Sequence, residues 1–145
     1  MKMGTKTTGV ALAQGGGMRA FLAITKALAD ESRVRIVMAL AKGELCLCQL
    51  IAMLGLAPST VSKHMAVLMQ AGLTKCRKAG RWHYYRLADA AQEERRPIWE
   101  TIKWVQAMVQ DSVVVEEDRK RLEGLSAEEA AIAAACMAKR AIGKL

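Results

Sequence analysis

The sequence has no hydrophobic run long enough to cross a membrane. Its longest mostly apolar stretch, residues 45–57, is interrupted by Gln49 and is shorter than the ~20 residues that a spanning helix needs. The first 17 residues contain no apolar block of signal-peptide length. We therefore expect no membrane partner and a cytoplasmic location. In that reducing compartment, four unevenly spaced cysteines are more often metal ligands or redox sensors than structural disulfides.

Motifs of common enzymes are also missing. The sequence contains no glycine-rich phosphate loop, no paired-histidine zinc signature and no nucleophile elbow. A small thiol enzyme would need a nucleophile beside an activating group and a pocket, and the sequence shows neither clearly. We therefore expect that the protein is not an enzyme, and a thiol enzyme such as a reductase stays a remote alternative.

Acidic residues are absent from one long stretch of the chain. None lies between Glu44 and Asp89, whereas the stretch holds six bases: Lys63, Lys75, Arg77, Lys78, Arg81 and Arg86. The formal net charge of all 145 residues is +8, and outside the stretch 16 bases stand against 14 acids, which leaves only +2 there. Such a basic block predicts a surface that binds a polyanion such as nucleic acid, although a solvated basic surface has the same composition.

The length predicts one compact domain with tails. Residues 1–17 are rich in glycine and threonine and predict a flexible N-terminal arm. We place a winged helix-turn-helix domain with a dimerisation helix at residues 18–115, and a C-terminal helical extension at residues 116–145. In that extension, a polar break at residues 116–123 precedes a last helix, for which Ser126 and Glu129 fit a capping box.

Apolar spacing predicts a helix at residues 18–29 and a second helix that either Asp30 or Ser32 caps and that ends near residue 41, followed by a helix-turn-helix. A short helix at 46–54, a tight turn and a helix at 59–70 form that motif. The second helix has an apolar stripe, and its other face suits a major groove because it carries short polar or cationic side chains. These are Ser59, Thr60, Ser62, Lys63 and His64.

Two strands at residues 73–77 and 82–87, with Gly80 between them, predict a β-hairpin. A hairpin after a recognition helix is a wing, and Arg77, Lys78 and Arg81 at its tip are placed to reach phosphates or the minor groove. The predicted fold is therefore mainly α with a small β-hairpin wing, a dimeric winged helix-turn-helix with about five to six helices.

A further helix at residues 97–113 has one long apolar stripe. Its members are Ile98, Ile102, Val105, Val109 and Val113, with Trp99 and Trp104 beside them. Such a stripe packs either against a second copy of the chain or against the helix's own core. The pattern does not decide between these two arrangements.

Cys46 and Cys48 form a pair of soft ligands suited to As(III), Sb(III), Cd(II) or Cu(I). Residues two apart in a regular helix lie about 200° apart around its axis, so both cannot face one ion there. They can face it at a frayed helix start, and coordination would then distort the short helix and move the recognition helix. Two alternatives stay open: small buried apolar residues, or a redox sensor oxidised through a mixed or inter-chain disulfide.

Four sequence motifs follow one another along the chain: ALADESRVRIVMAL, ELCLCQL, PSTVSKHMAVLMQAGL and KAGRWHYYRL. Together they resemble the ArsR/SmtB family of metal-responsive winged-helix repressors, in its arsenic-type form, over residues 24–87. The resemblance implies a homodimeric transcriptional repressor that binds a palindromic double-stranded DNA operator. It also implies that As(III), Sb(III) or another thiophilic ion acts as inducer and releases the DNA, and we expect no ion to be required for folding.

The resemblance also assigns residues. It places Ser59, Thr60, Ser62, Lys63 and His64 on recognition-helix positions, Arg77, Arg81 and Tyr85 on the wing beside Lys78, and Cys46 and Cys48 on the arsenic-box thiols. The best-known arsenic box has a third cysteine where this chain has Ile51. A third ligand would then be Cys136, which we favour slightly, or Cys76, a partner-chain thiol or a small-molecule thiol.

Overall fold

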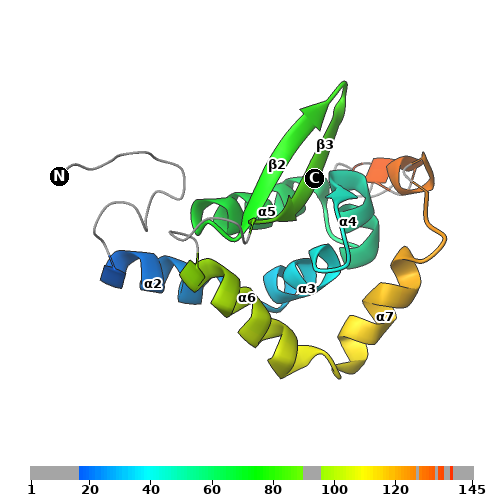
Figure 1. Ribbon diagram of the computed structural model, residues 1–145. Coiled ribbons are helices and arrows are strands. Elements are labelled where there is room, and N and C mark those ends of the chain that lie inside the picture. The colour runs from blue at the N-terminus through cyan, green and yellow to red at the C-terminus, as the bar shows by residue number, and fades with distance from the viewer. Residues whose placement is uncertain (1–16, 90–95, 127, 133, 136–137, 139–145) are drawn as a thin grey trace.

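The computed structural model describes residues 17–89, 96–126, 128–132, 134, 135 and 138 (Figure 1). Of the predicted N-terminal arm, only Gly17 is described, and it begins the first labelled helix. The elements in chain order are α2 (Gly17–Ala27), α3 (Glu31–Leu40), β1 (Leu45–Cys46), α4 (Leu47–Leu54), α5 (Pro58–Gln70), β2 (Thr74–Ala79), β3 (Trp82–Leu87), α6 (Arg96–Val109) and α7 (Val113–Leu122).

Helices α3, α4 and α5 form the centre of the hydrophobic core. Their fully buried side chains include Ile36, Leu50, Met53, Met65 and Leu68. Gly55 ends α4 in the left-handed conformation, with φ of 67°, and α5 begins at Pro58, where the fixed φ of proline suits a first helical turn. The predicted helix-turn-helix is confirmed, as is the mainly helical fold with a wing.

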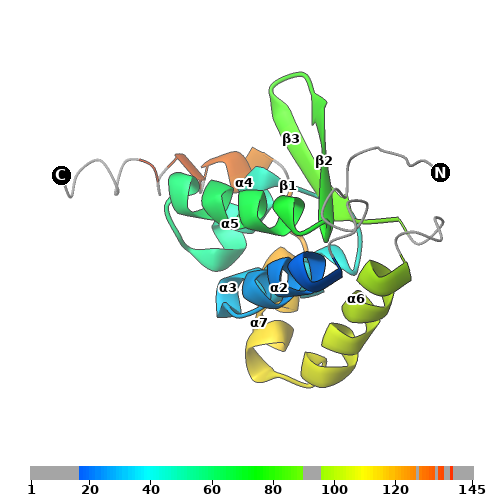
Figure 2. The ribbon, with the colours of Figure 1, turned by 90° about the vertical axis from the view of Figure 1, so that its left-hand side faces the viewer.

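The strands form one antiparallel sheet in the order β1-β3-β2. Ala79 pairs with Trp82, so the loop between β2 and β3 has only two residues. Gly80 comes first in this loop with φ of 61°, as a tight hairpin turn requires. The hairpin projects from the helical body (Figures 1 and 2). Strand β1 is a correction, because the sequence predicts Cys46 as the start of a helix and the structure pairs it with Tyr84.

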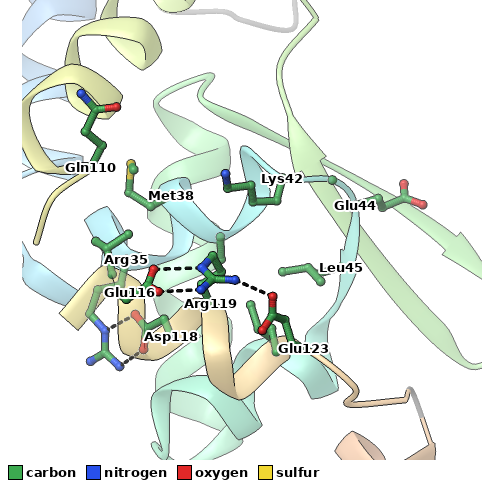
Figure 3. Close-up of a pocket in the computed structure, with 14 residues that line it drawn as sticks. Arg35, Met38, Lys42, Glu44, Leu45, Gln110, Glu116, Asp118, Arg119 and Glu123 are labelled. Carbon is green, nitrogen blue, oxygen red and sulfur yellow. Dashed lines mark hydrogen bonds and ion pairs between the residues drawn. The ribbon is translucent and has the colours of Figure 1, made fainter. Parts of the chain in front are cut away.

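Helix α7 corrects a second prediction. The sequence predicts a polar break at residues 116–123, but residues 113–122 form a helix that crosses the predicted domain boundary at residue 115. Glu116 in its first turn and three bases in its last turn complement the helix dipole. Its inward residue is charged: Asp118 is only 3% exposed and accepts two hydrogen bonds from Arg35 on α3 (Figure 3).

The described residues after Ser126 lie beside α4 (Figures 1 and 2). The predicted capping box is confirmed, because the Ser126 N–H donates to Glu129 Oε2 over 2.8 Å and the Glu129 N–H donates to Ser126 Oγ over 3.2 Å. Ala130 and Ala134 are buried. The extension therefore packs on the domain over its described part, while Cys136 lies outside the described residues.

No single helix among the described residues has the length and apolarity to cross a membrane. Helices α4 and α5 meet that criterion only as a pair, and this pair is bent by 113°. Both contribute side chains to the hydrophobic core.

Candidate nucleic-acid interface and thiol pair

One face of α5 is exposed and polar. Val61, Met65 and Leu68 are buried against the core, which leaves Ser59, Thr60, Ser62 and Lys63 exposed on the other side. His64 is half-buried at the edge of this face. The hydroxyls and the ammonium group offer hydrogen-bond donors and acceptors of the kind that read base edges or bind phosphates in a major groove.

The hairpin carries cations at its tip. Lys78, Gly80 and Arg81 are exposed, and the Arg81 guanidinium lies 5.3 Å from the centroid of the Trp82 ring. This contact limits the freedom of a long side chain without neutralising its charge. The tip of the hairpin that follows α5 therefore presents two exposed cations.

Arg77 is placed differently from the tip. Its Nη2 atom lies 2.7 Å from Oε1 of Glu44, and its guanidinium stacks 4.6 Å from the centroid of the Tyr84 ring. The hydrogen bond from Arg77 lowers the pKa of Glu44. Glu44 therefore already neutralises much of the charge that Arg77 could offer to a phosphate.

The acids at the two ends of the acid-free stretch fold back onto it. Glu44 pairs with Arg77, while Asp89 lies 2.9 Å from Lys75 and 3.6 Å from Arg86. Three of the six bases thus have an acidic partner. The part of the chain that the structure describes offers no ion pair to the other three, which are Lys63, Lys78 and Arg81.

The structure corrects the expectation for Tyr85. Its side chain is 7% exposed and belongs to the hydrophobic core. Burial first, and then the neighbouring Cys76 thiol, raise the pKa of Tyr85 to about 12. Because side chains alternate along a strand, Tyr84 is the tyrosine on the opposite, outer face. Tyr85 therefore has a packing role and is not placed to touch DNA.

Cys46 and Cys48 meet at the junction of β1 and α4. Cys46 is the N-cap residue, with extended backbone at φ −81° and ψ 159°, so the 200° offset of a regular helix does not separate it from Cys48. Burial raises the pKa of the Cys48 thiol, and the adjacent Cys46 thiol raises it further. Cys46 itself is fully buried. Two soft ligands are therefore adjacent, as one thiophilic ion would require.

Cys76 lies on the other side of the sheet from this pair. Cys46 pairs with Tyr84, whereas Cys76 pairs with Tyr85, and adjacent residues of β3 face opposite ways. Among the described residues, no group of three or more histidine, cysteine or acidic side chains is arranged to hold a metal ion. The described structure thus supplies two thiol ligands in one place and leaves Cys136 outside its range.

Gln49 is a residue that the sequence analysis missed. Its Oε1 accepts a hydrogen bond of 2.9 Å from the Cys46 N–H, and its Nε2 donates to the Leu125 carbonyl over 3.4 Å. The available signal was a polar residue inside an apolar run, three residues after Cys46. Gln49 connects the first cysteine with the C-terminal segment.

An apolar groove of about 610 Å³ lies between α2 and α6. Ile98, Ile102 and Val105 of α6 are buried in the molecule's own core. Large apolar side chains along the groove are nevertheless exposed, and they include Phe21, Trp104 and Met108. The helix packs against its own core and also leaves a second apolar face open.

Comparisons with known proteins agree with this architecture. The model of the bacterial regulatory protein, arsR family, matches residues 30–75. The arsenic resistance transcriptional regulator ArsR1 of Pseudomonas putida is 38% identical over 103 residues, which cover 68% of this chain and 73% of that protein. The arsenical resistance operon repressor of Escherichia coli is 45% identical over 64 residues, 43% of this chain and 55% of that protein.

A solved structure supports the same fold. It is the homodimeric winged helix-turn-helix DNA-binding domain of a Mycobacterium bovis protein, which is 26% identical to this chain with a TM-score of 0.55. The match covers 65% of this chain and 82% of that domain.

Proposed function

The chain belongs to the arsR family of bacterial regulatory proteins, and on this premise we propose that it represses transcription as a homodimer bound to a palindromic DNA operator. The observation that carries the proposal is the exposed polar face of α5, followed in the chain by a hairpin whose tip carries exposed cations. The relatives to which the chain aligns are transcriptional regulators. A repressor of this kind acts on DNA in the cytoplasm.

In this proposal α5 enters the major groove and the hairpin follows the backbone beside it. Ser59, Thr60 and Ser62 have side chains short enough to reach base edges, so they contribute to sequence choice. Lys63, Lys78 and Arg81 have no ion pair with any described residue, so no described carboxylate competes with the phosphates that they would neutralise. Arg77 contributes less because Glu44 already holds it.

The homodimer forms through the apolar groove between α2 and α6. A second copy of the chain supplies a matching apolar face, as expected for a two-fold symmetric interface. Burial of exposed side chains such as Phe21 and Trp104 provides the driving force. The matched Mycobacterium bovis domain is homodimeric, and a two-fold axis presents two copies of α5 to the two halves of a palindrome.

Cys46 and Cys48 would hold the inducer, which is As(III), Sb(III) or another thiophilic ion. Such an ion supplies a soft centre that takes thiolate ligands. Cys46 is fully buried at the N-cap of α4, so its backbone must shift before its sulfur can serve as a ligand. That shift would break the hydrogen bond from the Cys46 N–H to Gln49. The short turn after α4 carries the change to α5, and the DNA is released.

A third ligand for the ion would come from another cysteine of the chain or from a further thiol. Cys136 is preferred over Cys76, because the register of the sheet places Cys76 on the face opposite Cys46. A thiol from the partner chain or from a small molecule is the remaining source.

A redox sensor is the second candidate, because the two thiols are adjacent. A direct disulfide between residues two apart closes a very small ring and is strained. The raised pKa of Cys48 also reduces the thiolate fraction on which oxidation depends. We therefore rank metal sensing above redox sensing.

The test is a gel shift on the DNA upstream of the protein's own gene, titrated with As(III), Cd(II) and peroxide. We expect a retarded complex that As(III) dissociates. C46S and C48S should bind DNA like the wild type but resist As(III), whereas C76S, the matched control, should respond normally. Release by peroxide alone would favour the redox sensor. Stoichiometric As(III) binding that leaves the complex intact would overturn the proposed coupling.

A further inference from the structure

Arg33 joins three elements through its side chain. Its Nε donates to the Ala27 carbonyl over 2.7 Å and its Nη2 donates to the Lys26 carbonyl over 3.2 Å, both at the end of α2. Its Nη1 lies 3.1 Å from Nδ1 of His64 on α5. The backbone N–H of Arg33 donates to Asp30, the N-cap of α3. The three side-chain contacts fix the guanidinium in place.

The contact between Arg33 and His64 determines the state of the imidazole. A guanidinium has only donors and keeps its proton in proteins. The Nδ1 atom of His64 must therefore accept the hydrogen bond, so it carries no proton. A neutral ring with an acceptor at Nδ1 has its proton on Nε2.

We propose that Arg33 is a positioning residue that presents His64 to DNA as a hydrogen-bond donor through Nε2–H. This inference rests on the proposed DNA-binding role of α5. The partner is an acceptor on the DNA, either a phosphate oxygen or the N7 and O6 atoms of a guanine edge. A ring with the opposite tautomer would present an acceptor at that position and would be repelled by both.

The same side chain relates the recognition helix to the dimer face. Arg33 binds the last carbonyls of α2, which form the negative end of that helix and favour a cation. The other face of α2 carries Phe21 and lines the apolar groove. Arg33 therefore also holds α5 at a fixed distance from the surface that the second copy covers.

Nitrogen NMR of the free protein tests the tautomer without DNA. The chain has only two histidines, and His83 is exposed on β3, so H83Q assigns the spectrum and His83 serves as an internal reference. We expect His64 as the Nε2–H tautomer in the wild type, and a mixture of tautomers in R33M. An Nδ1–H tautomer in the wild type would overturn the proposal, as would a spectrum that R33M leaves unchanged. Because no DNA is present, this outcome is independent of the proposed function.

DNA titrations then test the role of the donor. Gln places an amide donor close to the position of Nε2, whereas Ala removes it. We expect H64Q to bind operator within about threefold of the wild type, and H64A and R33M each to lose about tenfold, the effect of one good contact. In the H64A background, R33M should cause no further loss of operator affinity. An equal loss from R33M in both backgrounds would overturn the proposed route through His64.

Two controls complete the design. R33K keeps the charge but lacks the planar fork, so it should resemble R33M in the spectrum, and thermal unfolding of each variant identifies any loss of fold. If the acceptor is a phosphate, H64A weakens binding to operator and to unrelated duplex equally. If the acceptor is a guanine edge, the loss is confined to the operator. Unaltered binding of H64A to both duplexes would overturn the proposed DNA contact.

Discussion

The carboxylate of Asp118 accepts two hydrogen bonds, each 2.8 Å long, from Nε and Nη2 of Arg35 (Figure 3). Asp118 also accepts one from Arg121 of its own helix, over 3.2 Å. The pair joins α7 to α3 across a distance of 83 residues in the sequence. Paired and largely buried, it connects the C-terminal part of the chain to the helix-turn-helix domain.

D118A should lower the free energy of unfolding by up to about 3–5 kcal/mol, because the largely buried Arg35 would keep only a 3.9 Å ion pair with the exposed Glu31. Urea unfolding followed by circular dichroism measures the effect. The double variant R35M/D118L removes both charges and should be much closer to the wild type. E123Q changes an exposed acid on the same segment and should have a small effect. A D118A protein as stable as the wild type would contradict the role assigned to the pair.

K63A and R81A should each weaken binding to every duplex and lower the slope of log affinity against log salt by about 1, because each removes a phosphate contact. Fluorescence anisotropy at several salt concentrations measures this slope. R77A is the matched control on the same hairpin, and its effect should be smaller because Glu44 already neutralises Arg77. Equal slopes in the wild type, K63A and R81A would refute the phosphate contacts.

Cd(II) affinity should rise with pH between about pH 6 and about pH 8, because Cd(II) binding must expel the thiol protons and the pKa of Cys48 is raised. Below that pKa the rise is up to about tenfold per pH unit for each proton released. As(III) exists as As(OH)₃, and each As–S bond that forms releases a water made from the thiol proton and a hydroxide. Its affinity should therefore be nearly constant over the same range. Calorimetry in two buffers measures the number of protons released, and identical pH dependence for both ions would be inconsistent with proton release on Cd(II) binding alone.

W104E should convert the homodimer to a monomer, because it places a charge at the exposed apolar side of α6. Sedimentation equilibrium gives the oligomeric state. K103E, on the neighbouring exposed position of the same helix, reverses a charge away from the groove lining and should remain dimeric. A W104E protein that still sediments as a dimer would place the interface elsewhere.

The sequence alone predicted the elements whose apolar residues recur at regular spacing or whose turn is marked by a glycine. Helices α3 to α5 bury regular apolar stripes, and Gly80 marks the hairpin turn. Helix α7 was missed because its inward contact is the carboxylate of Asp118, whose partner Arg35 is distant in the sequence. Strand β1 has two residues, which is too short to show any alternation.

The sequence predicted which face of α5 is exposed, but it did not predict the contacts that the side chains of the site make. Spacing identified the exposed side of α5 because its opposite side is apolar. On β3, alternation says that Tyr84 and Tyr85 face opposite ways, but both are aromatic, so only packing decides which one is buried. The pairing of Glu44 with Arg77 and the contact of Arg33 with His64 depend on tertiary structure.

Q49E should loosen the C-terminal segment while leaving the Cys46 cap in place. A carboxylate still accepts the Cys46 N–H but cannot donate to the Leu125 carbonyl, which it repels instead. Hydrogen exchange should therefore accelerate at residues 128–132 in Q49E. The same region should accelerate in the wild type on addition of As(III), because a shift of Cys46 displaces Gln49. In C46S, As(III) should have no such effect. If exchange accelerates in Q49E but As(III) has no effect on the wild type, the C-terminal segment is not coupled to the thiol pair. Gln49 would then have a structural role alone.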